Sequence, residues 1–594
     1  MSILVESLGE SWEALPPSNP TQYNESMQDR IRRVRSDLSD ILEFYNITIS
    51  LKRYRRLDQF YLAEFKSLKQ VPFDKLSQQD KVDYLLLRNF LNRERDQLVL
   101  EKRERNLELL ESFYPLIIEI CELRQSVEEV KGEVAATTFD LIKRRVRVAQ
   151  DLDLHAKKDV IYKSIQILTE LRNHLREFYQ FYHSYDPEFD WWAKAPWYEV
   201  DAALADYTST LERKLHPKGK EDEIMGEPIG RARLLVELDK ELIPYTPEEL
   251  IKYAETTYQW CLNEMQKAAQ EMGFERNEWM TALSRVKLQY TDPGKQPQLV
   301  KRLALEGKEF VEKHDLVTVP DVCHETYRMF MMAAERQKES PFFLGGPSII
   351  VSYPTAEMSY QDKLMVMKGN NKHFARATAF HELIPGHRLQ LYMAERHNTH
   401  RQMFETPFYV EGWAMYWELL FWKMGNFFKT PEDRIGTIFW RMHRCARIIF
   451  SLKFHLGQMS AQDCVEMLVN VVGHERANAE AEVRRSFKGD YPPLYQIGYM
   501  IGAVQLFELR KEVLDRGVMG EKEFHDQVLR ENTMSIELLR ALLLNLNLTP
   551  DYKSQWKFLD TPDQTTQHPR GYIGGVSSEE PSWFFAEETR SKSF

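Results

Sequence analysis

The segment Ala377–Leu391 reads A-T-A-F-H-E-L-I-P-G-H-R-L-Q-L and sets His381, Glu382 and His387 among apolar residues at helical spacing. Further along, the segment Tyr409–Leu420 reads Y-V-E-G-W-A-M-Y-W-E-L-L and predicts a second, acidic helix. Two imidazoles, an adjacent carboxylate and a later glutamate are the groups that a hydrolytic zinc site uses. The two segments together predict a metal-dependent hydrolase, with a peptidase as the first choice.

The spacing of the two histidines is unusual, because His387 comes six positions after His381, whereas the second histidine of the common H-E-x-x-H pattern comes four positions after the first. On an unbroken helix, that spacing would turn His387 by roughly 240° away from His381. Pro385 cannot donate a hydrogen bond to the carbonyl of His381, and Gly386 gives the chain freedom to turn. We therefore expect a distorted helix that brings both imidazoles together. The spacing alone favours two ordinary polar residues near a helix end, but the accompanying glutamates favour a metal site.

The two motifs H-E-L-I-P-G-H and E-G-W-A-M-Y-W-E resemble those of the domain-of-unknown-function family 885 (DUF885), whose members carry H-E-x-x-P-G-H and then E-G-W-A. That family resembles the gluzincin metallopeptidases, the group of thimet oligopeptidase and angiotensin-converting enzyme. The likeness covers roughly residues 25–560. It implies a mainly α, zincin-like metallopeptidase fold with a central cleft and a short edge β-sheet. It also implies one zinc ion per chain, with His381, His387 and Glu411 as ligands and Glu382 as general base.

A second glutamate, Glu418, lies seven residues after Glu411 and on the same helix face. From the residues alone, either carboxylate could be the third ligand. The gluzincin pattern places the ligand at the start of this helix, so the resemblance assigns it to Glu411 and leaves Glu418 to orient a ligating histidine. Imidazole and carboxylate ligands favour zinc, although other divalent metals such as manganese or cobalt fit such a site.

The segment Arg444–His455 (R-C-A-R-I-I-F-S-L-K-F-H) resembles the family's R-A-x-R…D-x-G-x-H segment. It departs from that pattern at Ser451 and Lys453, where the family has Asp and Gly, and it matches at His455. For His455 the functional interpretation is a donor to the oxyanion of the reaction. The alternative is a buried histidine that serves only the packing of the protein.

The segment Pro493–Gly502 (P-L-Y-Q-I-G-Y-M-I-G) resembles the family's P-G-Q-A-L-A-Y-K-I-G, with a match at Tyr499. Because Y-Q-I-G and Y-M-I-G occur in tandem, the register is open, and the distance from Pro493 favours Tyr499. Its phenol would hydrogen-bond the oxyanion, so it joins the catalytic candidates. The alternative is a tyrosine of the core.

Two arginines are candidates for substrate binding. Arg447 lies in the first of these segments, and Arg485 lies in Ala479–Ser486, which resembles the family's E-V-x-R-Y segment. Either guanidinium could bind a substrate carboxylate through paired hydrogen bonds. Structural pairing with Glu480 or Glu482 is the alternative.

The departures from the family pattern keep the predicted ligands and change the residues around them. The first functional hypothesis is a zinc-dependent hydrolase that cleaves amide bonds of short peptides or peptide-like metabolites, with metal-activated water and Glu382 as general base. The alternative is a metal-dependent tailoring enzyme of a biosynthetic pathway on the same fold, not a general peptidase. A binding or scaffold protein on an inactive fold is disfavoured, because all the groups of the site are present.

The composition limits the partners. A net charge of −11 and a pI near 5.9 argue against nucleic-acid binding. The sequence has no apolar run of about 18 residues, and its N-terminus lacks the features of a signal peptide. Five scattered cysteines without a C-x-x-C pair suit reduced thiols. We expect a cytoplasmic protein whose partner is a short peptide or peptide-like small molecule, with no nucleic acid and no membrane. The oligomeric state is unknown at this stage.

The 594 residues exceed one small domain. We expect an N-terminal helical half over residues 1–330 that forms one wall of the cleft, a catalytic metallopeptidase-like half over 331–549, and an irregular C-terminal tail over 550–594. One strand is expected at Gly345–Pro354 (G-G-P-S-I-I-V-S-Y-P). The resemblance to zincin-type enzymes implies that it is an edge strand that pairs with the substrate backbone.

Two local signals complete the prediction of the helices. Thr246-Pro247-Glu248-Glu249 has the cap, proline and acidic residues of a helix start, and this helix should run to about Met272. The aromatic residues Trp191, Trp192, Trp197 and Tyr198, with Pro187 and Pro196 beside them, are expected to interrupt the helices and to pack at a junction, with a platform for a ligand as the alternative.

Overall fold

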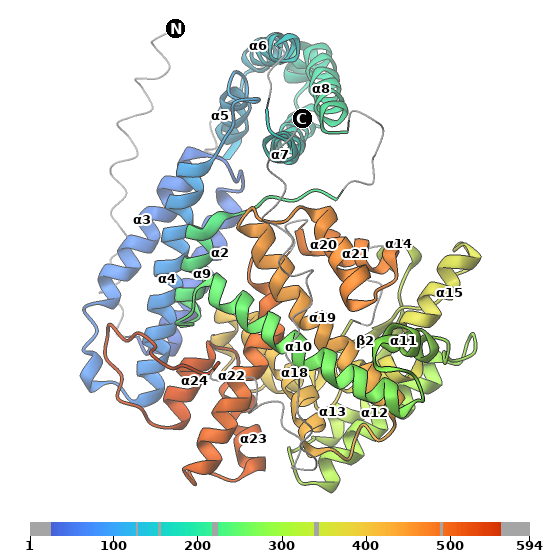
Figure 1. The fold of residues 1–594 in the computed structure, drawn as a ribbon. Coiled ribbons are helices and arrows are strands. Elements are labelled where there is room, and N and C mark those ends of the chain that lie inside the picture. The colour runs from blue at the N-terminus through green and yellow to red at the C-terminus, as the bar shows by residue number, and fades with distance from the viewer. Residues whose placement is uncertain are drawn as a thin grey trace, which may run out of the picture.

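The computed structural model describes residues 25–125, 129–152, 156–216, 224–337, 344–487 and 491–559. Within these ranges the protein is mainly helical, and its strands form a single two-stranded sheet (Figure 1). The predicted class, mainly helical with a short sheet, is confirmed. The zincin-like arrangement and the cleft stay predictions.

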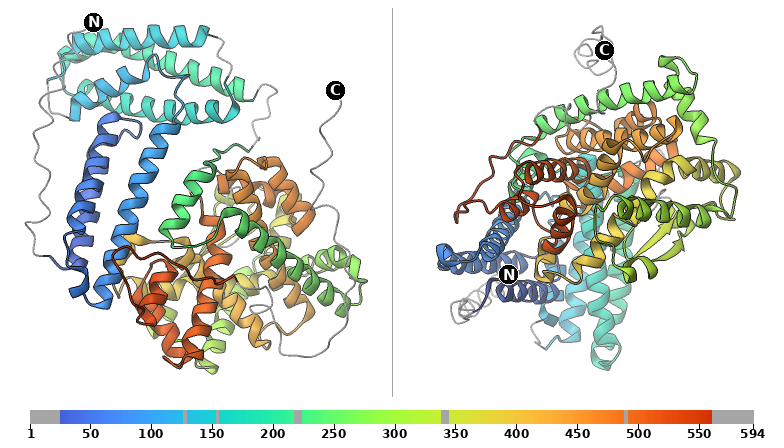
Figure 2. Two further views of the ribbon diagram at one scale, coloured as in Figure 1. Left: turned by 60° about the vertical axis from the view of Figure 1, so that its left-hand side comes forward. Right: turned by 90° about the horizontal axis from the view of Figure 1, so that it is seen from below.

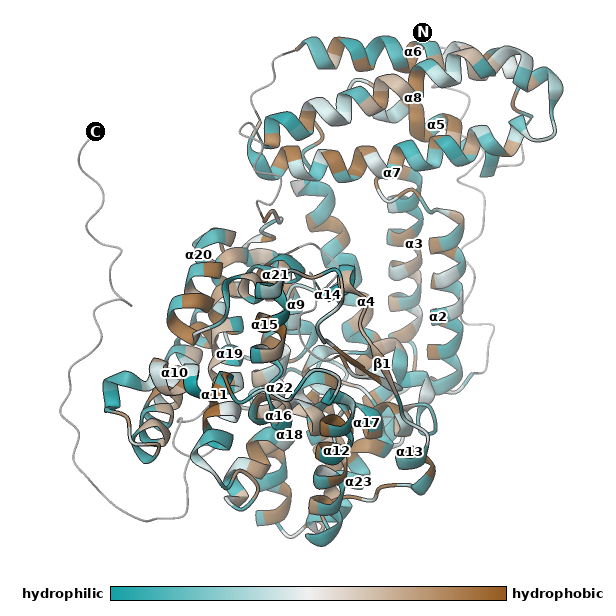
Figure 3. Ribbon diagram, turned by 90° about the vertical axis from the view of Figure 1, so that its right-hand side faces the viewer, coloured by the Kyte–Doolittle hydropathy of each residue, from teal (hydrophilic) through white to brown (hydrophobic). Residues whose placement is uncertain are grey.

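Three long helices form one edge of the molecule (Figure 1). Each begins after a serine whose hydroxyl accepts a hydrogen bond from a backbone N–H of the first turn, which satisfies a group that the helix itself leaves unpaired. Hydrophobic and hydrophilic residues alternate along α3, as expected for a helix with one buried face (Figure 3). The three helices are α2 (Met27–Phe44), α3 (Leu51–Leu68) and α4 (Gln78–Glu104).

Four further helices lie across one end of this group and have a hydrophobic core of their own (Figure 2). The expected interruption at the aromatic cluster is wrong, because one helix runs through it. That helix starts at Pro187, where a missing N–H costs nothing, and it contains Pro196. Trp197 is buried and stacks on Tyr179 at 4.7 Å between ring centroids. The four helices are α5 (Tyr114–Gln125), α6 (Gly132–Asp151), α7 (Lys158–His183) and α8 (Pro187–Leu215).

The next helices lead toward the sheet. The predicted start at Thr246 is confirmed: its hydroxyl accepts from the N–H of Glu249, and the Glu249 carboxylate accepts from the N–H of Thr246. This helix ends at Glu271, close to the expected end. The helices are α9 (Gly230–Lys240), α10 (Pro247–Glu271), α11 (Trp279–Lys287), α12 (Gln296–Lys313), α13 (Asp321–Glu325) and α14 (Ala334–Gln337).

The sheet pairs β1 (Arg328–Met331) with β2 (Ser348–Val351) in parallel. The strand predicted at Gly345–Pro354 is therefore confirmed with shorter bounds. On the side away from β1, Ile350 exchanges two backbone hydrogen bonds with Leu344, at 2.8 and 3.0 Å. The buried face of β2 packs in a small core on α12 and on the helix that carries the first predicted histidine.

The remaining helices form the C-terminal half of the chain. They are α15 (Tyr360–Gly369), α16 (Lys372–Glu382), α17 (His387–Ala394), α18 (Pro407–Met424), α19 (Pro431–His455), α20 (Ala461–Met467), α21 (Arg476–Phe487), α22 (Tyr495–Asp515), α23 (Glu521–Glu531) and α24 (Ile536–Leu543). Short 3-10 turns occur at Phe73–Lys75, Arg276–Glu278 and Thr399–Phe404, and a π-helical turn occurs at Leu468–Val472.

Glycines let α18 and α22 approach closely. A Cβ on Gly412 would lie 2.7 Å from the carbonyl carbon of Gly502, and one on Gly502 would lie 2.0 Å from the carbonyl oxygen of Phe408. Gly498 sits against Pro407 in the same way, at 2.7 Å. Any larger residue at these positions would push the two helices apart, so these glycines set the spacing between α18 and α22.

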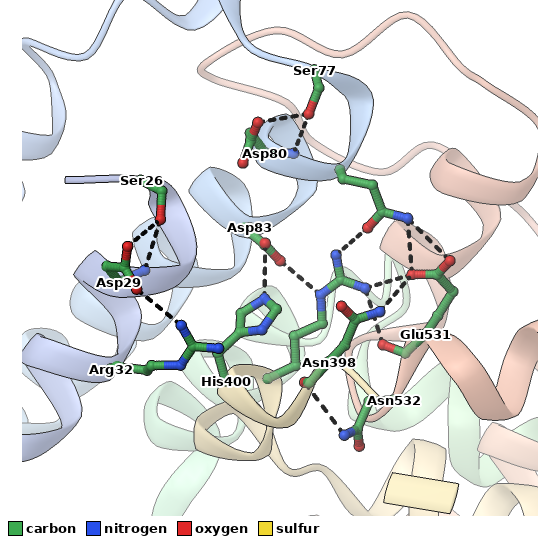
Figure 4. A network of polar contacts seen from close by, with 12 residues as sticks. Ser26, Asp29, Arg32, Ser77, Asp80, Asp83, Asn398, His400, Glu531 and Asn532 are labelled. Carbon is green, nitrogen blue, oxygen red and sulfur yellow. Dashed lines mark hydrogen bonds and ion pairs between the residues drawn. The ribbon is translucent and has the colours of Figure 1, made fainter. Parts of the chain in front are cut away.

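A buried network of ion pairs joins α4 to the C-terminal half (Figure 4). Asp83 accepts hydrogen bonds from His400 at 2.9 Å and from Arg401 at 2.7 Å, and Arg401 also donates to Glu531 at 2.6 Å. The largest hydrophobic core contains residues from both sides of the predicted boundary at residue 330. The N-terminal helices and the C-terminal half therefore share a core and a polar joint.

None of the helices in the described ranges is both long and apolar enough to span a membrane. The five cysteines are buried and form no disulfide. Residues 550–559 contain no helix or strand. The rest of the predicted tail, and the N-terminal residues on which the signal-peptide prediction depends, lie outside the described residues.

Candidate metal centre

The central segment folds as two helices rather than as one distorted helix. α16 ends at Glu382, and α17 begins at His387. Gly386 donates its N–H to the carbonyl of Phe380 at 3.0 Å, and a Cβ on Gly386 would lie 1.8 Å from the carbonyl oxygen of His381. Only glycine fits this contact. The distortion expected at Pro385-Gly386 is thus a complete break, which turns the second helix until its first residue faces the end of the first.

This break brings three candidate ligands together. The Nε2 atom of His387 lies 3.2 Å from Glu411 Oε2, the Nε2 atom of His381 lies 3.7 Å from the same oxygen, and one ligand atom from each residue lies within 4.8 Å of the others. All three side chains are buried. A tetrahedral zinc ion with bonds of about 2.0–2.1 Å places neighbouring ligand atoms about 3.3 Å apart. Two imidazoles and a carboxylate at these separations fit such an ion.

Glu418 lies behind His381 and accepts a hydrogen bond from its Nδ1 at 2.8 Å. Because the carboxylate accepts, Nδ1 carries a proton, and Nε2 is the ring nitrogen that faces the cluster and would bind an ion. Burial alone would raise the pKa of Glu418, but the hydrogen bond from His381 and the charge of Arg444, 3.7 Å away, hold it below its ordinary value. The structure thus places Glu418 where it orients a candidate ligand.

Glu382 is buried beside the cluster and touches the backbone before β2. A Cβ on Gly345 would lie 2.0 Å from Glu382 Oε2, so the carboxylate lies against this glycine. Burial raises the pKa of Glu382, although the charges of His381 and His387 act in the opposite direction. A carboxylate with a raised pKa next to a candidate ligand is suited to accepting and returning a proton.

Tyr495, which sequence reasoning did not select, lies closer to the cluster than Tyr499. Its hydroxyl donates to Glu411 Oε1, and the hydroxyl of Tyr499 donates to that of Tyr495 at 3.3 Å. The Tyr499 ring stacks on His381, with 6.2 Å between centroids and 11° between planes. The tandem Y-Q-I-G-Y-M-I-G could have identified Tyr495 as a site residue, because a four-residue repeat places both tyrosines on one helix face.

The predicted arginines lie behind Tyr499. The guanidinium carbon of Arg447 is 4.5 Å from the centroid of this ring, and Arg447 Nε donates to Glu482 Oε1 at 2.7 Å. Arg485 Nε is 4.0 Å from Glu482 Oε2, and its guanidinium carbon is 5.0 Å from the ring of Tyr491. Of the two carboxylates named as alternative partners, Glu482 is therefore the one that both arginines approach.

The structure does not bring His455 to the cluster. Arg444 and His455 share a face of α19, but the eleven helical steps from one to the other span about 16 Å along the axis. His455 packs near Phe487, with 6.3 Å between ring centroids, and its Nδ1 has no hydrogen-bond partner in the described part of the chain. Burial, together with the charge of Arg233, lowers the pKa of His455 to about 4. Its predicted role at the oxyanion therefore has no geometric support.

The family described as "Bacterial protein of unknown function (DUF885)" matches residues 47–543. The chain belongs to the DUF885 family. This range includes every candidate residue of the metal centre. No curated protein matches the chain.

Two solved structures share the fold of this DUF885 protein. One is described as "a putative lipoprotein of unknown function from Shewanella oneidensis", with a TM-score of 0.63 and 16% identity over 88% of this chain and 100% of its own. The other, described as "the putative lipoprotein from Colwellia psychrerythraea", has a TM-score of 0.54 and 17% identity over 87% of this chain and 98% of its own. At these identities the likeness concerns the fold.

Proposed function

We propose that this DUF885 protein is a zinc-dependent hydrolase that cleaves amide bonds in short peptides or peptide-like metabolites. The observation that supports the proposal most strongly is the meeting of His381, His387 and Glu411, with their ligand atoms within 4.8 Å of one another. A relation to the gluzincin metallopeptidases, with a zincin-like fold, is part of the proposal. This relation is supported by two features: His381 and His387 lie on either side of the break between two helices, and Glu411 comes from a third helix.

In this proposal the three ligands hold the ion and the neighbouring side chains handle protons. A bound zinc ion supplies Lewis acidity and lowers the pKa of a coordinated water. Glu382 takes a proton from the attacking water and returns it to the leaving nitrogen. Tyr495 is the phenol that bonds to a candidate ligand, and in the reaction it would turn its single O–H from Glu411 to the oxyanion, while Tyr499 donates to its hydroxyl from one turn along α22.

Metal analysis and one conservative variant test the proposal. We expect about one zinc per purified chain, lost in both His381→Ala and His387→Ala. Glu382→Gln should keep the zinc and lose about 100- to 10,000-fold in turnover of a mixture of short peptides, which is the usual worth of a general base. Glu395→Gln, at an exposed glutamate just after α17, is the matched control and should behave as wild type.

Two outcomes would contradict the proposal. Zinc retained after His387→Ala would mean that the second histidine is no ligand. Full turnover by Glu382→Gln would remove the general base. Bound zinc without cleavage of any peptide in the mixture would instead favour the alternative of a tailoring enzyme with other chemistry on the same metal centre.

A further inference from the structure

Three arginines beside the candidate metal centre, of which Arg444 and Arg447 are buried and Arg485 is largely buried, each have an N–H group without a hydrogen-bond partner in the part of the chain that the structure describes. Arg444 and Arg447 are 5% and 3% exposed, and the side chain of Arg485 is 10% exposed. Among the described residues, Arg444 Nε, Arg447 Nη1 and Arg485 Nε have no hydrogen-bond acceptor. A buried, unsatisfied donor on a charged group costs free energy. The unpaired oxygen Glu482 Oε2 lies 4.0 Å from Arg485 Nε, beyond hydrogen-bond distance, and it could serve only part of the group. Within the described ranges, the three donors therefore leave room for an added acceptor.

The charges around these arginines do not balance. Glu482 is the carboxylate closest to Arg447 and Arg485, at 2.7 and 4.0 Å. Arg444 is 3.7 Å from Glu418, but that carboxylate already accepts a hydrogen bond from His381. A guanidinium keeps its charge at every physiological pH. Among the described residues, these three guanidinium groups have two carboxylates within 4 Å, Glu418 and Glu482, one of which bonds to a candidate ligand, and an added anion would offset the excess of positive charge.

The arginines lie one aromatic ring away from the candidate ligands. The guanidinium carbons of Arg444 and Arg447 are 4.6 and 4.5 Å from the centroid of Tyr499, the ring that stacks on His381. On the other side, Arg485 lies over the ring of Tyr491, which in turn packs against the tyrosine bonded to Glu411. A peptide residue spans about 3.3–3.6 Å, so one or two residues of a substrate bridge this separation.

We propose that Arg444, Arg447 and Arg485 form a subsite for a carboxylate of the substrate, placed one or two residues from the amide bond that is cleaved. The inference rests on the proposed function and names its substrate class: short peptide-like amides that carry a free carboxylate. Planar guanidinium groups match a carboxylate through paired hydrogen bonds. Within the same cluster, Arg447 already donates one hydrogen bond to a carboxylate, from its Nε to Glu482 Oε1.

Peptide binding to inactive protein tests the subsite separately from catalysis. The Glu382→Gln protein, loaded with zinc, is titrated with dansyl-Gly-Ala-Ala as free acid and as C-terminal amide, and with dansyl-Gly-Ala-Asp amide. The free acid should bind about 10- to 100-fold more tightly than its amide, the worth of hydrogen bonds to a charged group. Tight binding of the Asp amide instead would mean that the subsite accepts a side-chain carboxylate.

The variant Arg485→Gln, in the same background, should reduce the preference for the free acid to less than threefold. Arg485 is the best choice because it is the arginine farther from Glu482, whereas removing Arg447 would leave that carboxylate buried without its closest partner. Arg485→Lys should restore part of the preference. Arg484→Gln removes a charge from the next residue of the same helix and should leave the preference unchanged. A thermal melt of each variant confirms that it is folded.

Several results would overturn the subsite. These are equal binding of acid and amide by the parent protein, no binding of either up to millimolar concentration, or an unchanged preference after Arg485→Gln. The two proposals fail separately. A clear preference for the acid in a protein whose wild type cleaves no amide would contradict the hydrolase and leave the subsite intact. Cleavage of peptide acids and amides with equal efficiency would contradict the subsite and leave the hydrolase intact.

Discussion

Replacing Gly345 with alanine should damage catalysis through one contact. The added Cβ would lie 2.0 Å from Glu382 Oε2, and its next neighbours are the Cα and the carboxyl carbon of the same residue, both at 3.2 Å. Ordinary contact with a Cβ begins at about 3.4 Å, so the carboxylate must move by more than 1 Å. No ligand of the candidate metal centre is among these neighbours, so the metal should stay bound.

The expected loss follows from the size of that displacement. A catalytic group misplaced by about 1 Å costs about 100-fold in rate. We therefore expect kcat/KM of Gly345→Ala to fall about 100-fold, which corresponds to about 2.7 kcal/mol of activation free energy. The zinc content should remain that of the wild type.

The assay is hydrolysis of a short peptide beside metal analysis of the same preparation. Gly520→Ala is the control, because a Cβ at Gly520 meets nothing within 4 Å. The effect should be strongly non-additive with Glu382→Gln, since both changes act on one carboxylate. Wild-type kcat/KM in Gly345→Ala would refute the placement of Glu382, and so would an undiminished 100-fold effect in the Glu382→Gln background.

Three further predictions concern side chains around the centre and in the core. Glu418→Gln should weaken zinc binding about 10- to 100-fold in a chelator competition, because the charged partner of a ligating histidine is lost; an unchanged affinity would contradict its orienting role. Tyr495→Phe should lower kcat more than Tyr499→Phe, since the Tyr499 hydroxyl reaches Glu411 only through Tyr495; the reverse order in steady-state kinetics would restore Tyr499 as the main donor. Burial holds the pKa of His525 at about 3, below the unfolded value of about 6.5, so its contribution is complete above pH 6.5 and is lost as the pH falls toward 3, by up to about 1.4 kcal/mol per pH unit. Urea unfolding between pH 7.5 and 5 should therefore show a smaller pH dependence for His525→Gln than for wild type, and equal slopes would count against it.

Local chemistry in the sequence was enough to predict several elements. The cap at Thr246 and the strand after Gly345 depend only on neighbouring residues, and the structure contains both. The break at Pro385-Gly386 was predictable for the same reason, because a missing N–H and a missing Cβ act within one turn. That the segment forms two separate helices depends on the packing of Gly386 against the carbonyl of His381. This contact could not be predicted from the sequence.

Distances between elements were harder to predict. Tyr495 reaches Glu411 because glycines hold α18 and α22 close together, a tertiary spacing that no single segment reveals. His455 was selected by its place in a motif, and a helical wheel puts it on the same face as Arg444. The wheel omits height along the axis, and α19 runs without a break from Pro431 to His455. The aromatic cluster in α8 failed as a breaker because its first proline suits a helix start.

The break after Glu382 also has a thermodynamic consequence. The two histidines belong to two helices and Glu411 to a third, so an ion bound there would link α16, α17 and α18 as a non-covalent staple. Such an ion binds the folded chain alone, and it would add about 4 kcal/mol to stability when its free concentration is about 1,000 times the Kd. The fraction of folded protein would then depend on the supply of metal. A low concentration of the ion would shorten the lifetime of the folded chain as well as abolish its activity.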